Sequence, residues 1–224
     1  MCSYWDLFQI HFFTYWTSTL FFTVLDWFSI STSYIHKFTW HHRKIEWNLW
    51  LNGAASVLFN QFVITLPLSY LICDFIPCIA ASWNLRVMLT QFAGLLLIEE
   101  VLFYYIHRLL HSKWLFENVH YFHHQWREPY AVMALSSHPL EHLFSNALPL
   151  IIAPWLLNTP SNMLYFWIGI ATLNAVLAHS GYYIFFKPTN GSHDLHHRFR
   201  NINFGVLGIL DYIHGTVSDT KSNK

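Results

Sequence analysis

Histidines recur at helical spacing in three short segments of the second half of the chain. The first segment holds two histidines four residues apart, and each of the other two has the pattern H-x-x-H-H. Residues at i, i+3 and i+4 share one face of a helix, so we expect each segment to direct its imidazoles toward one point. Neutral imidazole binds iron, zinc, copper and nickel. The candidate metal ligands are therefore His107, His111, His120, His123, His124, His193, His196 and His197.

Three further histidines lie beside the ends of a predicted hairpin in the membrane. His138 and His142 lie just before its first arm, 143–157, and His179 directly follows its second arm, 162–178. A short hairpin returns to the side on which it began, so His142 and His179 should reach the same face. We add His179 to the ligands and keep His138 and His142 as further candidates. Tetrahedral zinc uses about four ligands, so nine to eleven imidazoles favour two metal ions.

The remaining histidines lack the repeated pattern. We expect these side chains to lie at the membrane interface, as tryptophan and tyrosine do, without a role in metal binding. They are His11, His36, His41, His42 and His214.

One acidic residue within a predicted membrane segment accompanies the first histidine pair. Glu100 lies seven residues before His107, on the same helical stripe. An ionisable residue in a membrane segment indicates function by default. We expect Glu100 to accept an N–H from a ligand imidazole and to fix its tautomer. Carboxylate-bridged di-iron bundles need two Glu-x-x-His pairs, and only Glu117 with His120 fits, so we regard that class as a weak alternative.

The composition indicates that these segments belong to a membrane protein. Of 224 residues, 54% are hydrophobic and 11% are charged, whereas soluble domains average about 25% charged residues. The net charge of zero argues against a nucleic-acid binder, which would carry a basic excess. Three cysteines without a C-x-x-C pair argue against a thiolate metal site.

Five apolar stretches are candidate membrane helices, because a spanning helix needs about 20 mostly apolar residues. The stretches 12–35, 54–73 and 85–106 meet this length, and we interpret 143–157 and 162–178 as a hairpin that need not cross the bilayer fully.

The basic residues predict the orientation of these helices. Eleven of the 12 Lys and Arg residues fall on the side that carries the three histidine segments and the C-terminus, which predicts that this side faces the cytoplasm. The expected fold is an all-α integral membrane protein with four to five transmembrane or re-entrant helices and a cytoplasmic, histidine-rich di-metal cap. We expect a single membrane-embedded domain over 1–224.

The histidine segments resemble the three histidine boxes of the fatty acid hydroxylase/sterol desaturase superfamily, whose members are di-metal membrane oxygenases. The similarity covers about 95–215, and F-Y-Y-I-H-R-L-L-H (103–111), A-H-S-G-Y (178–182) and H-D-L-H-H (193–197) resemble its sterol branch. That branch includes the cholesterol 25-hydroxylases and the sterol 4-methyl oxidases. The superfamily often has an acidic residue where Glu100 stands, and H-P-L-E (138–141) is similar to a motif of the 4-methyl oxidases and desaturases.

The resemblance implies an enzyme of the endoplasmic reticulum membrane that hydroxylates a sterol with O₂ at two iron ions, as a cholesterol 25-hydroxylase does. It also implies electrons from NAD(P)H through an external reductase and cytochrome b5. The chain has no G-x-G-x-x-G nucleotide fingerprint, which agrees with an external donor. The expected partners are thus a membrane lipid or sterol and the electron donor, with no nucleic acid.

Other functions remain open from the sequence. A sterol 4-methyl oxidase or a sterol desaturase would use the same metal centre. A non-catalytic zinc-binding or metal-transport membrane protein is an alternative from another class. Transport favours ligands near the bilayer midplane, whereas these histidines gather at one end of the membrane segments.

Overall fold

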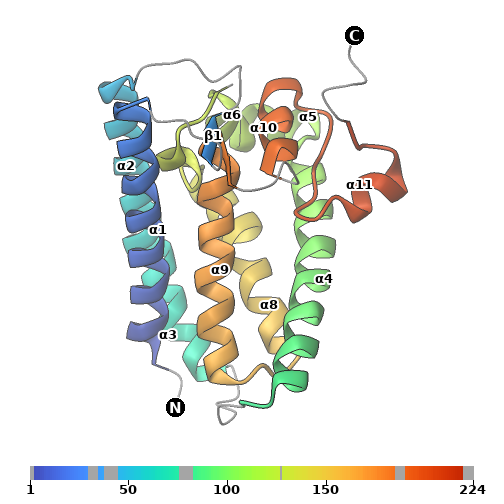
Figure 1. Ribbon diagram of the computed structural model, residues 1–224. Coiled ribbons are helices and arrows are strands. Elements are labelled where there is room, and N and C mark those ends of the chain that lie inside the picture. Colours follow the sequence, from blue (N-terminus) through green and yellow to red (C-terminus); the bar gives the residue numbers. More distant parts are fainter. Residues whose placement is uncertain are drawn as a thin grey trace.

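The long helices form a bundle in this computed structural model, which describes residues 3–29, 35–37, 45–75, 83–126, 128–184 and 190–218 (Figure 1). The described chain is nearly all helical, which confirms the predicted all-α class. The bundle consists of α1 (Tyr4–Trp27), α4 (Leu85–Leu110), α9 (Ser161–His179) and a helix with a π-helical turn in its middle, made of α2 (Trp47–Asn60), η1 (Gln61–Thr65) and α3 (Leu66–Phe75).

Short elements gather at one end of this bundle, which we call the cap (Figure 1). They are α5 (Lys113–Leu115), the π-helical η2 (Phe116–His120), α6 (Tyr121–His124), the 3-10 turn η3 (Ala131–Met133), α7 (Pro139–Glu141), α10 (Asn190–Phe199) and α11 (Ile209–His214). Strands β1 (Ile35–Lys37) and β2 (Tyr182–Ile184) pair antiparallel there, with Ile35 opposite Ile184. From the cap, the π-helical η4 (His142–Ala147) and α8 (Leu148–Leu156) return into the bundle.

Three described helices are long and apolar enough to cross a membrane, namely Trp47–Cys73, Leu85–Leu110 and Ser161–His179. Two of them correspond to the predicted segments 54–73 and 85–106. The third, which contains the second arm of the hairpin, was expected only as a segment that need not cross.

The first predicted segment has a different end in the structure. Helix α1 ends at Trp27, and Ser29 adopts a left-handed conformation with φ of 51°. The predicted helix over 12–35 is therefore correct to Trp27 and wrong beyond it, since Phe28 ends the helix and Ile35 begins a strand. Helix α1 is also not among the three helices that meet the length and hydropathy for a span.

Helix α4 places the first histidine pair at the cap. Asn84 begins the helix by accepting a hydrogen bond from the backbone N–H of Val87 (3.2 Å), which satisfies one free donor of the first turn. Leu89 and Leu97 are exposed on its outer face, as side chains in contact with lipid would be. His107 lies in the last turn and His111 follows it as the C-terminal cap.

Polar contacts to α1 and α2 hold the loop 130–137 at the cap. Tyr15 Oη donates to the carbonyl of Val132 (2.7 Å), and Asn60 Nδ2 donates to the carbonyl of Ser137 (3.0 Å). Both side chains are buried, so each hydrogen bond satisfies a carbonyl that has no access to water. This loop also carries the Ser136 carbonyl, which contacts a histidine of the cap.

The predicted hairpin is present, and its first arm is irregular. Helix α8 has only nine residues, with Pro154 inside it, and it follows the π-helical turn η4. The connection to α9 is short, and Asn158 adopts a positive φ of 47° there. Helix α9 then runs back to the cap and ends at His179, as the hairpin geometry predicted.

Candidate metal centre

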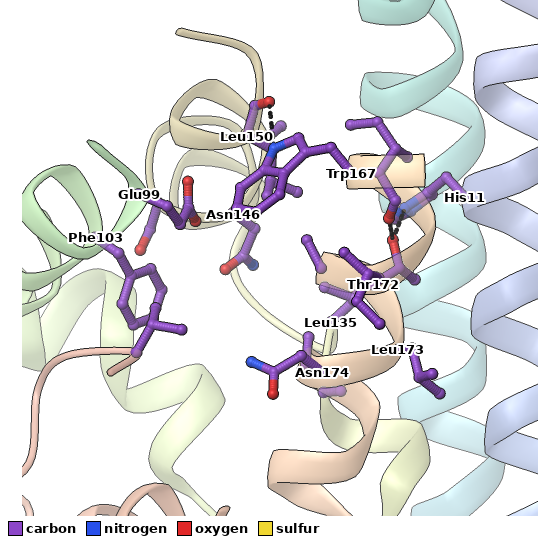
Figure 2. A pocket seen from close by; sticks show the side chains of 18 of the residues that line it. His11, Glu99, Phe103, Leu135, Asn146, Leu150, Trp167, Thr172, Leu173 and Asn174 are labelled. Carbon is purple, nitrogen blue, oxygen red and sulfur yellow. Dashed lines mark hydrogen bonds between the residues drawn. The ribbon is translucent and has the colours of Figure 1, made fainter. Parts of the chain in front are cut away.

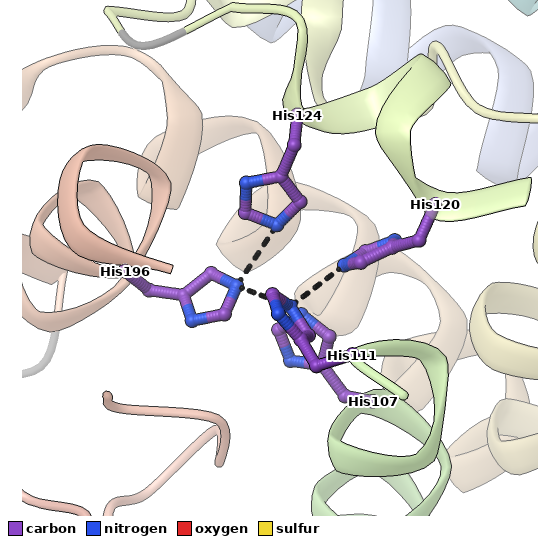
Figure 3. A group of neighbouring side chains, drawn as sticks. All are labelled: His107, His111, His120, His124 and His196. Carbon is purple, nitrogen blue, oxygen red and sulfur yellow. Dashed lines mark hydrogen bonds between the residues drawn. The ribbon is translucent and has the colours of Figure 1, made fainter. Parts of the chain in front are cut away.

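Nine histidines converge in the cap, in two neighbouring groups. Within each group the candidate ligand nitrogens lie within 4.8 Å of one another. The first group, drawn in Figure 3, is His107, His111, His120, His124 and His196. The second group is His123, His179, His193 and His197. The structure thus brings together the eight histidines of the boxes and His179.

The boxes divide between the two groups in a regular way. In each box the two histidines at i and i+4 enter the same group, whereas His123 and His196, at i+3, enter the other group. Successive residues of a helix differ by about 100° in direction, so the i+3 ring points away from the i+4 ring beside it. The expectation that each box serves one point is therefore wrong, because two boxes contribute to both groups.

Backbone carbonyls orient five of the nine rings. A carbonyl oxygen can only accept, so each of these Nδ1 atoms carries the hydrogen and donates it, and Nε2 keeps its lone pair. The pairs are His107 with Phe204 (2.8 Å), His123 with Ser136 (3.2 Å), His179 with Ala175 (2.7 Å), His196 with Ile202 (2.7 Å) and His197 with Trp126 (3.2 Å).

Rings with such an Nε2 lone pair lie close to other Nε2 atoms of the cap. His179 Nε2 lies 3.2 Å from His123 Nε2, although both atoms carry lone pairs. In the first group, His196 Nε2 lies 3.1 Å from His111 Nε2 and 3.0 Å from His124 Nε2. Facing lone pairs repel each other, and a cation bound between them turns the repulsion into coordination. The donor set therefore fits a metal ion in each group.

The nitrogen spacing also bears on the coordination number. With metal–nitrogen bonds of about 2.1 Å, neighbouring ligands lie about 3.4 Å apart in a tetrahedron and about 3.0 Å apart at right angles. The shortest observed separations, 3.0 to 3.2 Å, lie between these two values and so fit either geometry. Five histidines in the first group also exceed the four ligands of a structural zinc site. The number of histidines therefore favours an ion with more than four ligands in the first group.

Burial keeps the imidazoles of the cap in the form that binds metal. His124, His196 and His197 have no exposed surface. Burial, which disfavours the charged ring, lowers the pKa of these three side chains well below the usual value, and it lowers the pKa of His120 to about 3. Since a histidine is neutral above its pKa, these rings are neutral near pH 7 and their nitrogens are free to bind an ion.

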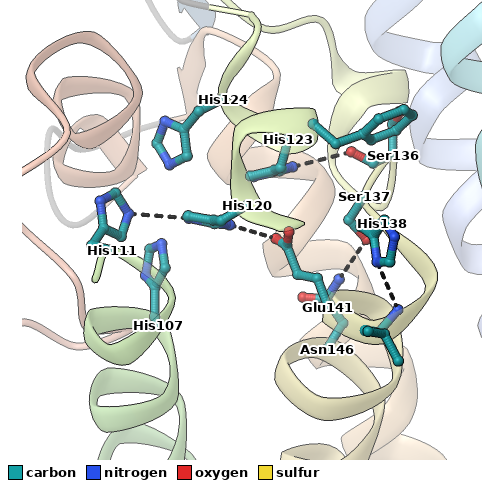
Figure 4. A network of polar contacts seen from close by, with 12 residues as sticks. His107, His111, His120, His123, His124, Ser136, Ser137, His138, Glu141 and Asn146 are labelled. Carbon is teal, nitrogen blue, oxygen red and sulfur yellow. Dashed lines mark hydrogen bonds and ion pairs between the residues drawn. The ribbon is translucent and has the colours of Figure 1, made fainter. Parts of the chain in front are cut away.

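Glu141 is a site residue that the sequence reasoning missed (Figure 4). Its Oε1 lies 2.8 Å from His120 Nδ1, and both side chains are buried. A carboxylate behind a ligand imidazole fixes the orientation of the ring and increases its basicity. The available signal was the H-P-L-E motif at 138–141, in which the glutamate, and not the histidine, contacts the metal-binding groups.

His138 and His142 lie outside both groups, unlike the other candidate ligands. His138 precedes α7, and its Nδ1 accepts a hydrogen bond from the backbone N–H of Leu140 (3.2 Å). His142 begins η4, with its Nε2 at 2.9 Å from Thr65 Oγ1. Helix α7 thus directs Glu141 to the metal-binding groups and turns the two histidines elsewhere.

Glu100 has a different role from the one expected. Its carboxylate accepts three backbone N–H bonds, from Val206 (2.8 Å), Leu207 (2.7 Å) and Leu210 (3.0 Å). The predicted contact with a ligand imidazole is therefore wrong, because the segment after α10 folds over Glu100 and supplies its donors.

A second carboxylate, Asp211, completes the support of this segment. It accepts the backbone N–H groups of Phe204 (2.8 Å) and Gly205 (2.7 Å). Since the carbonyl of Phe204 accepts from His107, Glu100 and Asp211 together position one ligand of the first group through the backbone.

The histidines without the repeated pattern have different locations. His11 is buried, with 8% of its surface exposed, so its expected interfacial position is wrong. His214 lies on the surface, where its Nε2 is 3.0 Å from Tyr105 Oη. His36 lies in β1, and His41 and His42 lie outside the described residues.

A cavity of about 380 Å³ extends from the histidine groups into the bundle. Figure 2 shows side chains that line it within the bundle. This volume is within the range of small-molecule sites. Its cap end is formed by histidines of both groups, namely His107, His120, His123, His179 and His193. Farther from the cap its walls are mainly apolar, with Leu96, Leu150, Leu164 and Trp167 among them. A lipid in this cavity would have one end against the candidate metal centre.

Comparison with known proteins identifies the family. The fatty acid hydroxylase family model matches residues 92–216. Human fatty acid hydroxylase domain-containing protein 2 is 38% identical over 177 residues, which cover 77% of this chain and 53% of that protein. A putative methylsterol monooxygenase of Dictyostelium discoideum is 30% identical over 81% of this chain and 72% of its own. A very-long-chain aldehyde decarbonylase of rice is 33% identical over 62% of this chain and 56% of its own.

The histidine boxes and the helical fold thus belong to a family of membrane oxidoreductases. The chain is a member of the fatty acid hydroxylase family. It spans about half the length of the human relative. No solved structure matches it significantly.

The contact between Glu141 and His120 leads to a prediction for metal affinity. We expect Glu141→Ala to weaken metal binding about 10- to 100-fold, because the His120 ring loses the carboxylate that orients it. Titration of the purified apoprotein with Fe²⁺ measures this change. Glu117→Ala is the matched control, since Glu117 lies in η2, the same element as His120, and its side chain is exposed. Equal affinities for the two variants would contradict the role of Glu141.

Gly205 allows a test of the indirect role of Glu100. A Cβ atom at Gly205 would lie 2.8 Å from Glu100 Oε1 and 3.0 Å from Asp211 Oδ2. We expect Gly205→Ala to displace the Phe204 carbonyl and to lower the affinity of the first group about 10-fold or more. Gly169→Ala is the control, because the nearest atom to its added Cβ is 3.6 Å away. Wild-type metal affinity in Gly205→Ala would refute this positioning.

Proposed function

We propose that this protein is an O₂-dependent di-iron membrane monooxygenase that hydroxylates a sterol, in the manner of the cholesterol 25-hydroxylases. The observation that carries the proposal is the mainly apolar cavity that ends against both histidine groups. Family membership supports the oxidation of a lipid. The sterol-like sequences around the boxes and the methylsterol monooxygenase relative support a sterol as the substrate.

The residues of the cavity and the cap would divide the work. Two iron ions, when bound, would supply the reduction of O₂ and the transfer of one oxygen atom to carbon. The histidines at the cap end would hold these ions next to the lipid, with their rings fixed by the backbone carbonyls and by Glu141. The apolar walls would exclude water and orient the lipid so that one C–H bond faces the centre.

We propose that the cap faces the cytoplasm in the endoplasmic reticulum membrane. The distribution of Lys and Arg supports this orientation. Helix α3 ends at the end of the bundle remote from the cap (Figure 1), and Cys73 in its last turn is disulfide-bonded. Disulfides persist in oxidising compartments such as the lumen of this organelle, which supports the same orientation. Electrons from NAD(P)H, through a reductase and cytochrome b5, would reach the centre from the cap. An open surface pocket beside Arg108 and Asn201 reaches His111 from that side.

A sterol 4-methyl oxidase is the second candidate. The H-P-L-E motif, with Glu141 next to His120, and the Dictyostelium relative favour it. Both functions use the same cap and differ in the carbon that is placed next to it. The position of the new oxygen in the product separates them.

The proposed function predicts a metal-dependent sterol product. The protein, reconstituted with iron without oxygen and then supplied with O₂, electrons and cholesterol, should form a hydroxylated sterol that mass spectrometry detects. We expect His123→Ala to lower the product at least 100-fold, because the second group loses a ligand. His138→Asn is the control, since asparagine keeps the N-terminal cap of α7 and His138 lies outside both groups.

Three outcomes would count against the proposal. The first is that the protein binds no iron, and the second is that His123→Ala leaves the amount of product unchanged. The third is that the protein binds zinc tightly and oxidises no lipid. The last outcome would favour the non-catalytic zinc protein.

A further inference from the structure

The cavity wall contains an acidic residue that the metal centre does not use. Glu99 lines the cavity from α4 and is 7% exposed. Its Oε2 has no hydrogen-bond partner among the described residues. The neighbouring Glu100, by contrast, accepts three backbone N–H bonds, so its burial has a structural reason. A carboxyl group without such partners inside a membrane bundle indicates a functional contact.

The surroundings of Glu99 fit a hydroxyl group. Figure 2 places the side chains of Glu99 and Asn146 in the same part of the cavity, near Trp167 and Leu150. A carboxyl oxygen accepts a hydrogen bond, and the Asn146 amide, which donates one hydrogen to Ser137 Oγ (3.4 Å), has a second hydrogen to donate. A hydroxyl group can do both at once, whereas a purely hydrocarbon ligand would leave the buried carboxyl unpaired.

Glu99 also lies well away from the metal-binding groups. It precedes His107 by eight residues of α4, which corresponds to about 12 Å along the helix. Phe103, which also lines the cavity, lies between them and packs on the His107 ring, with 5.0 Å between the ring centroids. A group bound at Glu99 is therefore too far from the cap to be the group that is oxidised.

We propose that Glu99 binds the hydroxyl group of an amphiphilic lipid and thereby selects a carbon remote from that hydroxyl for oxidation. This inference rests on the proposed function, which supplies the lipid and the reaction at the cap. The lipid lies with its hydroxyl at Glu99 and its apolar body toward the histidines. A sterol held in this way presents its side chain to the centre. The methyl group on the carbon next to the hydroxyl-bearing carbon, which a 4-methyl oxidase oxidises, stays far from the cap.

Equilibrium binding tests the contact without turnover. Radiolabelled cholesterol and its analogue without the hydroxyl, cholest-5-ene, are titrated against the purified full chain in lipid nanodiscs. The wild type should prefer cholesterol. We expect Glu99→Leu to weaken cholesterol binding about 10-fold or more and to leave cholest-5-ene binding unchanged, because only the hydroxyl loses its partner. Glu99→Gln should stay within a few-fold of the wild type, since the amide oxygen still accepts.

Asn174→Leu provides a matched control for a general loss of polarity. Asn174 lines the same cavity from α9, five residues before His179 and so nearer the cap. This variant should keep the preference for cholesterol. Metal content and the thermal unfolding temperature, measured on each variant, identify any that fail to fold.

The outcomes separate this inference from the proposed function. If Glu99→Leu binds cholesterol and cholest-5-ene like the wild type, or loses both equally while it keeps its metal, Glu99 does not bind the hydroxyl. A protein that loses the preference for cholesterol in Glu99→Leu yet oxidises no sterol would support the hydroxyl contact and overturn the proposed function. Oxidation at the carbon next to the hydroxyl-bearing one, or at a methyl group attached to that carbon, would overturn the proposed placement of the lipid.

Discussion

The convergence of neutral imidazoles on two points is the constraint on which the rest of this structure depends. His123 and His179 each donate Nδ1–H to a carbonyl, and so they present lone pairs to each other at 3.2 Å. Such an arrangement is unfavourable unless a cation lies between the rings. The cap therefore has to keep the rings in place against their mutual repulsion, and the backbone carbonyls and Glu141 provide that support.

The supporting groups come from widely separated parts of the chain. Tyr15 of α1 and Asn60 of α2 hold the loop that carries the Ser136 carbonyl. Glu100 of α4 holds the segment that follows α10. The membrane bundle thus acts as the scaffold of the cap, and its helices also enclose the cavity. This arrangement explains how an apolar ligand and a polar, metal-binding centre can meet in one small protein.

Much of the candidate site could be predicted from the spacing of histidines. The helical offsets identified the eight histidines of the boxes, and the hairpin geometry added His179, because both signals are local or depend on one short turn. The assignment of His123 and His196 to the opposite group could not be predicted. It depends on how α6 and α10 are oriented relative to each other, which no local pattern records.

The supporting residues were harder to predict for the same reason. Glu100 was expected to contact an imidazole because both lie on one stripe of α4. Its carboxylate instead accepts hydrogen bonds from backbone N–H groups that lie more than 100 residues later in the chain. Glu141 was missed because its partner His120 lies on a different element. His11 seemed interfacial from its isolation in the sequence, and only the packing of α1 against α9 shows that it is buried.

Counting and characterising the metal ions tests the central claim most directly. Elemental analysis of the iron-loaded protein, combined with X-ray absorption at the iron edge, gives the number of ions per chain and their nearest neighbours. The two histidine groups predict two ions per chain, each with four or five nitrogen neighbours at about 2.0 to 2.2 Å. One ion per chain, or a first shell dominated by sulfur, would contradict this account of the cap.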